Sequence, residues 1–228
     1  MKYIYKTRWW MKWWYPSLIW EIKTKRKEIF LTFDDGPDPE VTPWVLDQLK
    51  FHNAKATFFC VGKNVEKHPE LYNRILREGH SVGNHTYNHL NGWETDYEKY
   101  IVNVKKCGHV FGSQFFRPPH GRINRKQIQK LKSRYKIVMW TLLSGDFDPD
   151  ISARECSYNT VQYSEPGSII VFHDSKKCKE TLYQALPKIL NLSSKVMRSS
   201  IEYGSDPAMV ASSFIFISMS IITSPVSE

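Results

Sequence analysis

From residue 28 onward the chain alternates short apolar, β-branched runs with segments of helical periodicity. Most of the runs stop at glycine, proline or paired polar residues, as buried strands do where they enter turns. Strands are expected at 28–33, 56–61, 80–82, 115–117, 136–140 and 168–172, and helices at 42–53, 65–77, 95–110, 124–131 and 181–190.

This order of elements constrains the fold more than any other feature of the sequence. Strands that alternate with helices pair in parallel through crossover connections, so the sequence predicts an α/β sheet or barrel. In such folds the chemistry lies at the carboxyl ends of the strands. Thr42 and Pro43 are expected to begin the helix over 42–53, as its cap and its first-turn proline.

Charge is distributed unevenly along the chain. The net charge is +9, and residues 1–27 alone carry +7 of it. A nucleic-acid-binding protein usually spreads a basic face over its folded domain, so no nucleic-acid partner is expected. The same segment contains five of the eight tryptophans, namely Trp9, Trp10, Trp13, Trp14 and Trp20.

Two interpretations of residues 1–27 remain open. The segment is either a strap that packs its aromatic residues on the domain, or a patch for peripheral contact with a membrane, where Trp and Lys suit the headgroup region. Basic residues interrupt every apolar run in it, so it does not have the pattern of a signal peptide. The expected location is therefore the cytoplasm or the periphery of a membrane.

The last 36 residues differ in composition from the rest. Residues 193–228 contain eleven serines, and no clear further βα unit follows the helix expected at 181–190. The tail either supplies a last strand at 214–217 or is foreign to the fold. The expected organisation is a basic N-terminal segment over 1–27, a folded α/β domain over 28–192 and a tail over 193–228.

Polar clusters follow several of the expected strands. Asp34 and Asp35 end the first strand, where one carboxylate can bind a cation while the other handles a proton; a simple turn-forming pair is the alternative. His85 and His89 have the spacing that places two imidazoles on one face of a helical turn. With a carboxylate from another strand end they make a set of two His and one Asp. Three protein ligands is the number typical of catalytic zinc.

Two more clusters complete this edge of the predicted sheet. Arg117 precedes two prolines, His120 and Gly121, and is interpreted as orienting a carboxylate, while the His120 main-chain N–H faces an oxyanion. Asp146 follows the fifth expected strand and His173 ends the sixth. A carboxylate beside His173 would keep that imidazole protonated near neutral pH, fit to act as an acid.

These motifs resemble, in their order, those of the polysaccharide deacetylase family, the NodB-homology domain of carbohydrate esterase family 4. They are Thr-Phe-Asp-Asp-Gly-Pro, His-Thr-x-x-His, Arg-Pro-Pro-x-Gly, an Asp-containing turn and an apolar strand that ends in His. The resemblance covers about residues 28–190. It implies a distorted (β/α) barrel of about seven parallel strands.

The resemblance also implies roles for individual residues. The implied metal ligands, for zinc or else cobalt or another divalent ion, are Asp35, His85 and His89. The implied catalytic residues are the base Asp34, its orienting partner Arg117, the acid His173 and Asp146, which tunes the acid. The residues implied to shape the substrate and oxyanion site are Pro119, His120, Gly121 and Val171, the last of which lines the pocket for the acyl methyl group.

Two positions depart from the family pattern. His120 stands where tyrosine is frequent, and Phe147 stands where tryptophan usually follows the aspartate. The function expected from the resemblance is metal-dependent hydrolysis of the N-acetyl group of amino sugars in a glycan or glycoconjugate. The alternatives are a deacylase of a lipid-linked amino sugar at the membrane surface and a non-catalytic glycan-binding homologue.

Overall fold

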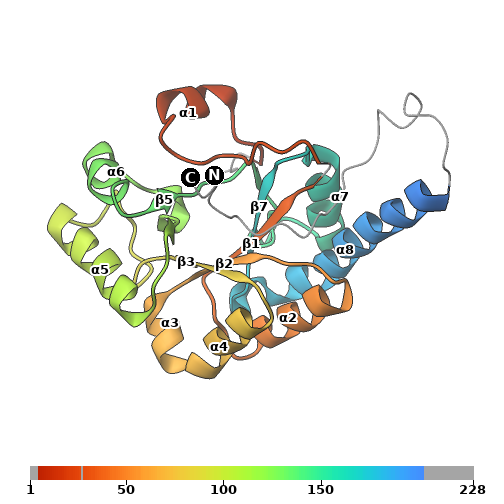
Figure 1. Ribbon diagram of the computed structural model, residues 1–228, viewed down its shortest axis with the longest axis horizontal. Helices are drawn as coiled ribbons and strands as arrows, with labels where there is room; N and C mark the ends of the chain where they lie inside the picture. Colours follow the sequence, from red (N-terminus) through yellow and green to blue (C-terminus); the bar gives the residue numbers. More distant parts are fainter. Residues whose placement is uncertain (1–4, 27, 203–228) are drawn as a thin grey trace, which may run out of the picture.

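The protein is built around one parallel sheet that curls into a distorted barrel (Figure 1). The computed structural model describes residues 5–26 and 28–202, with side chains up to residue 191. The strand order is β5-β4-β3-β2-β1-β7-β6, and every pair is parallel. The strands are β1 Phe30–Asp34, β2 Thr57–Cys60, β3 Ser81–Asn84, β4 Phe115–Phe116, β5 Lys136–Ile137, β6 Leu142–Leu143 and β7 Ile169–His173. The predicted α/β barrel of about seven parallel strands is confirmed.

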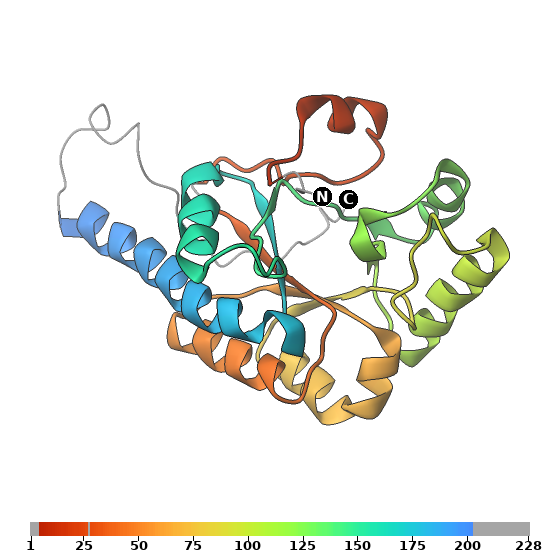
Figure 2. The same ribbon diagram turned by 180° about the vertical axis from the view of Figure 1, so that it is seen from behind.

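Helices surround the outer face of this sheet, as Figures 1 and 2 show from opposite sides. The helices are α1 Trp9–Trp14, α2 Val41–Phe51, α3 Gly62–Lys67, α4 Pro69–Arg77, α5 Tyr97–Val110, α6 Arg125–Leu131, α7 Ala153–Tyr163 and α8 Lys179–Glu202. Two 3₁₀ turns, η1 Pro119–Gly121 and η2 Lys176–Cys178, follow strands β4 and β7.

The gap between the edge strands β5 and β6 is crossed by the N-terminal segment. Ile19 forms a parallel bridge with Val138, and Lys6 forms an antiparallel bridge with Leu142. Leu18 and Trp20, on either side of Ile19, are buried. The residues ahead of the first strand thus form part of the barrel wall.

Several elements differ from the prediction. The sequence did not predict strand β6, which is only two residues long and brings the described sheet to seven strands, or helix α7. The alternative last strand at 214–217 lies outside the described part of the chain. The helix expected at 65–77 is two helices, because the chain leaves helical geometry at His68, just before Pro69. Thr42 is not the cap of α2: the Asp38 carboxylate accepts the first free N–H groups instead, and the Thr42 hydroxyl donates to Asp174 at 2.5 Å.

The strand that carries the site is fixed by aromatic packing. The Phe33 ring is fully buried and stacks on Phe58 and Phe172, with ring centroids 5.2 and 5.8 Å away. These three rings join β1 to both of its neighbours. The carboxyl end of β1 is therefore held in register with those of β2 and β7.

We expect Phe33→Ala to lower the free energy of unfolding by about 3–5 kcal/mol, the usual cost of emptying a buried phenylalanine site. Urea denaturation at constant m-value measures it. Phe51→Ala is the matched control, because that ring is 82 % exposed, and it should change stability by no more than about 0.5 kcal/mol. Equal losses in the two variants would contradict the packing argument.

Candidate functional site

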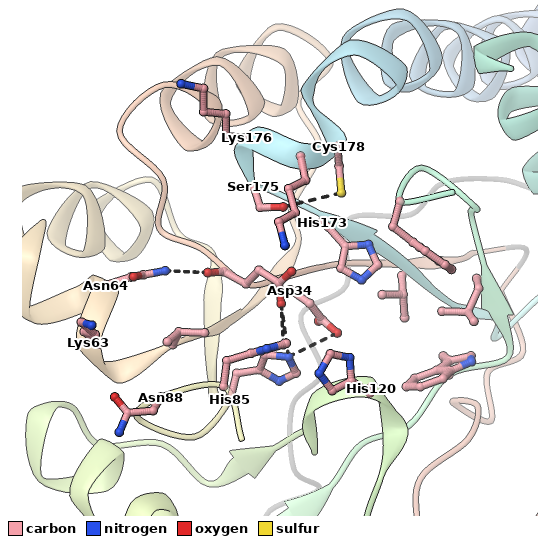
Figure 3. A pocket seen from close by; sticks show the side chains of 18 residues that line it. Asp34, Lys63, Asn64, His85, Asn88, His120, His173, Ser175, Lys176 and Cys178 are labelled. Atoms are coloured by element: carbon pink, nitrogen blue, oxygen red, sulfur yellow. Dashed lines mark hydrogen bonds and ion pairs between the residues drawn. The ribbon is translucent and has the colours of Figure 1, made fainter. Parts of the chain in front are cut away.

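The polar clusters meet in one pocket at the carboxyl ends of the strands (Figure 3). Its volume is about 870 Å³. Residues that lie far apart in the sequence line it together: Asp34, Asp35, His85, His89, His120, Val171 and His173. Of the predicted site residues, Pro119 and Gly121 shape the η1 turn beside the pocket and are not among its lining residues, while Arg117 and Asp146 lie buried behind it.

Asp35, His85 and His89 form a candidate metal centre. One Asp35 carboxylate oxygen lies 2.9 Å from His89 Nε2 and 3.6 Å from His85 Nε2, and one ligand atom from each residue lies within 4.8 Å of the others. Burial raises the pKa of Asp35, but hydrogen bonding to the two imidazoles outweighs burial and holds it well below its usual range. Two imidazole nitrogens and one carboxylate, facing an open pocket, fit a divalent ion such as catalytic zinc.

A main-chain contact orients the buried ligand His85. Its Nδ1 lies 2.8 Å from the Arg117 carbonyl oxygen. Because a carbonyl only accepts, Nδ1 donates this hydrogen bond, and Nε2 is the ring nitrogen that faces Asp35 and the candidate metal position. Outer hydrogen bonds of this kind fix the tautomer and ring orientation of metal-binding histidines.

The two histidines do not share a helical turn, so that part of the prediction is wrong. Residues 85–89 form a loop in which Thr86 and His89 have φ values of 63° and 56°. Two buried asparagines hold the loop: Asn84 Oδ1 accepts the Thr86 N–H at 2.9 Å, and Asn103 Oδ1 accepts the next two N–H groups. The sequence did not indicate the role of either asparagine in holding the loop. Asn103 reaches the loop from α5, which is a separate element.

Asp34 is held by the buried guanidinium of Arg117. Arg117 NH1 lies 2.7 Å from Asp34 Oδ1, while the second carboxylate oxygen faces His85 Nε2 at 4.0 Å. The expected paired hydrogen bonds are not formed: the other guanidinium groups donate to the carbonyls of Val138 and Met139. Burial lowers the pKa of Arg117 against the opposing pull of Asp34. One Asp34 oxygen is thus left directed at the metal centre.

His173 and Asp146 form a second pair in the pocket wall. His173 Nδ1 lies 2.9 Å from Asp146 Oδ1, and the His173 main-chain N–H donates to the other oxygen at 2.7 Å. Burial lowers the pKa of His173, but the Asp146 charge and hydrogen bond raise it to about 9. Asp146 follows β6 rather than the fifth strand, and the Ser144 hydroxyl orients it at 2.9 Å.

The remaining walls are apolar on one side and basic on the other. Trp140, Leu143, Phe147 and Val171 make the apolar side, and Lys63, Lys176 and Lys177 line the rim together with amide side chains. Gly121, at φ 67°, leaves room for the Trp140 ring, since a Cβ there would lie 2.5 Å from it. The sequence analysis missed Trp140 and Leu143, which lie in the irregular stretch around β6, and the three lysines.

The His120 ring also faces the metal centre. It stands edge-on to the His89 ring with centroids 4.6 Å apart, and burial lowers the pKa of His120. The sequence interpretation gave a role only to the His120 main-chain N–H. In the η1 turn the N–H groups of Gly121 and Arg122 bond to the carbonyls of the two prolines.

Comparison with known proteins agrees with this geometry. Residues 21–135 match the family model described as polysaccharide deacetylase. A peptidoglycan-N-acetylglucosamine deacetylase of Bacillus cereus is 40 % identical to this chain. The match covers 66 % of this chain and 57 % of the length of that relative. A chitooligosaccharide deacetylase of Azorhizobium caulinodans is 34 % identical, over 67 % of this chain and 76 % of its own length.

A solved structure shares the fold as well. The crystal structure of a peptidoglycan N-acetylglucosamine deacetylase superposes with a TM-score of 0.76 at 34 % identity, covering 82 % of this chain and 91 % of the other. The motifs, the fold and these relatives together show that the chain belongs to the polysaccharide deacetylase family.

Proposed function

We propose that the protein is a metal-dependent hydrolase that removes the N-acetyl group from amino-sugar units of a glycan. One observation carries the proposal: a carboxylate free to accept a proton and an imidazole poised to donate one line the same pocket as the candidate metal centre. Relatives of this chain are named as deacetylases of peptidoglycan and of chitooligosaccharides. Every catalytic position implied by the resemblance is filled, which argues against a non-catalytic homologue.

The residues of the chain divide the work of amide hydrolysis between them. Asp35, His85 and His89 would hold a divalent ion, zinc in the first place, which would supply Lewis-acid polarisation and a water of lowered pKa. Asp34, fixed by Arg117, accepts the proton of the attacking water. The His120 N–H donates to the oxygen that gains negative charge. His173 then protonates the amine that leaves, which would otherwise depart poorly.

The basic rim narrows the class of glycan. Lys63, Lys176 and Lys177 are exposed and form none of the ion pairs found among the described residues. Figure 3 shows Lys63 and Lys176 on one side of Asp34, with His120 on the other. A neutral acetamide needs no excess of positive charge, whereas a cleft lined by one sign of charge attracts the opposite sign. We therefore place a carboxylate-bearing glycan, such as peptidoglycan, ahead of neutral chitooligosaccharides.

We expect Asp34→Asn to keep the bound metal and to lose about 10²–10⁴-fold in kcat, the usual contribution of a positioned base. His85→Ala should lose both metal and activity. Metal analysis of the purified protein, paired with amine release from N-acetylglucosamine oligomers and peptidoglycan, measures both. Full activity in Asp34→Asn would show that another group accepts the proton.

The raised pKa of His173 sets the alkaline limit of activity. The imidazolium form that donates a proton is present below about pH 9 and is lost as the pH rises through that value. Asp146→Asn removes the charge that raises this pKa and leaves the burial that lowers it, so the alkaline limb of kcat/KM should move to lower pH. An unchanged limb in Asp146→Asn would rule out His173 as the acid.

The double variant Lys63→Gln, Lys177→Gln should raise KM roughly 2- to 30-fold for carboxylate-bearing glycan fragments, because each exposed charge pair contributes about 0.2–1 kcal/mol. KM for neutral chitooligosaccharides should stay the same, and the difference should shrink as salt screens the charges. Lys126→Gln with Lys130→Gln, on α6, is the matched control. Equal effects on both substrates would remove the charge argument and leave the proposed reaction intact.

A further inference from the structure

Helix α1 presents four tryptophans to solvent. Trp9, Trp10, Trp13 and Trp14 are 78, 38, 74 and 56 % exposed, and no residue of this helix is buried. Figures 1 and 2 both show α1 standing out from the sheet at the top of the molecule. We call these four side chains the tryptophan patch. Contiguous apolar surface of this kind usually marks an interaction site.

The tryptophan patch is held outward by firm attachments at both ends of α1. Before the helix, the Thr7 N–H donates to the Thr141 carbonyl at 2.8 Å and its hydroxyl donates to the Trp140 carbonyl at 2.6 Å. After it, Leu18 and Trp20 are buried, and Trp20 Nε1 donates to the Tyr15 carbonyl at 3.1 Å. Exposure of the four rings is thus a feature of a well-anchored segment.

The geometry of the rings argues against a flat sugar-binding platform. The Trp10 and Trp14 rings are 5.4 Å apart and inclined at 68° to each other. Stacking of successive sugar rings needs aromatic faces that are close to coplanar. Indole rings at mixed angles, with polar N–H groups at their edges, suit the headgroup region of a lipid bilayer.

The surrounding charge indicates the kind of bilayer. Residues 1–27 carry +7 of the net charge of +9. Arg8 directly precedes the patch, and Lys23, Lys25 and Arg26 lie exposed on the same segment. The only acidic side chain in the segment, Glu21, is ion-paired with Lys12. Each basic side chain near an anionic membrane surface adds roughly 1 kcal/mol of attraction.

We propose that the tryptophan patch and the exposed basic residues of the same N-terminal segment bind the surface of an anionic lipid bilayer. The indole rings lie at headgroup level and the basic side chains contact lipid phosphates. Contact of this kind is peripheral: within residues 5–26 and 28–202, no helix has the length and apolarity needed to cross a bilayer. The inference rests on α1 and its flanks alone, independently of the reaction in the pocket.

Co-sedimentation of the full chain with phospholipid vesicles tests it. The protein should bind vesicles that contain phosphatidylglycerol at least 10-fold more strongly than vesicles of pure phosphatidylcholine, and binding should weaken as salt rises. The triple variant Trp9→Ser, Trp13→Ser, Trp14→Ser should lose at least 10-fold in binding with an unchanged Tm, because these rings are exposed. Phe51→Ser, an exposed aromatic on α2, is the matched control and should bind as the unchanged protein does.

The charge contribution has its own variant. Lys23→Gln, Lys25→Gln, Arg26→Gln should remove most of the preference for anionic vesicles. Failure of the full chain to bind phosphatidylglycerol vesicles, or undiminished binding by the triple tryptophan variant, overturns the proposal. Two other outcomes would also overturn it, each in the absence of vesicle binding. One is binding to insoluble glycan that the tryptophan substitutions abolish, and the other is a dimer, detected by light scattering, that the same substitutions abolish.

Discussion

The buried guanidinium of Arg117 is the contact on which the site depends. A fully buried positive charge is costly unless each of its donors finds a partner. Here it bonds to Asp34 and Thr32 on β1 and to the carbonyls of Val138 and Met139, which follow β5. The Arg117 carbonyl also fixes the ring of His85. One residue therefore aligns the candidate base and one metal ligand, and links β1 to the residues that follow β5.

The parallel sheet explains how residues far apart in sequence share one pocket. β3, β2, β1 and β7 are neighbours in the sheet, and polar site residues lie at the carboxyl ends of β1, β3 and β7. The stacked rings of Phe33, Phe58 and Phe172 lock three of the strands below that edge. In α/β folds the packed sheet is usually the rigid scaffold, and the loops at the carboxyl ends of its strands carry the catalytic residues.

The sequence alone predicted the strands that are mostly apolar and mostly buried. β1, β2 and β7 are of this kind, whereas β6 is two residues long and leaves no periodic signal. Helix α7 was missed although Ser152 and Glu155 form a capping box that could have indicated it. The loop from His85 to His89 could not be foreseen, because the Asn103 side chain, 15 residues or more away in the sequence on α5, holds its shape together with the neighbouring Asn84.

The residues ahead of the first strand connect two surfaces that look unrelated. Thr7 bonds to the backbone of Trp140, whose ring lines the pocket, and only Arg8 separates Thr7 from the exposed indole of Trp9. The pocket lining and helix α1 are thus connected through two residues, Thr7 and Arg8. A displacement of α1 would therefore reach the backbone of a pocket-lining residue through Thr7.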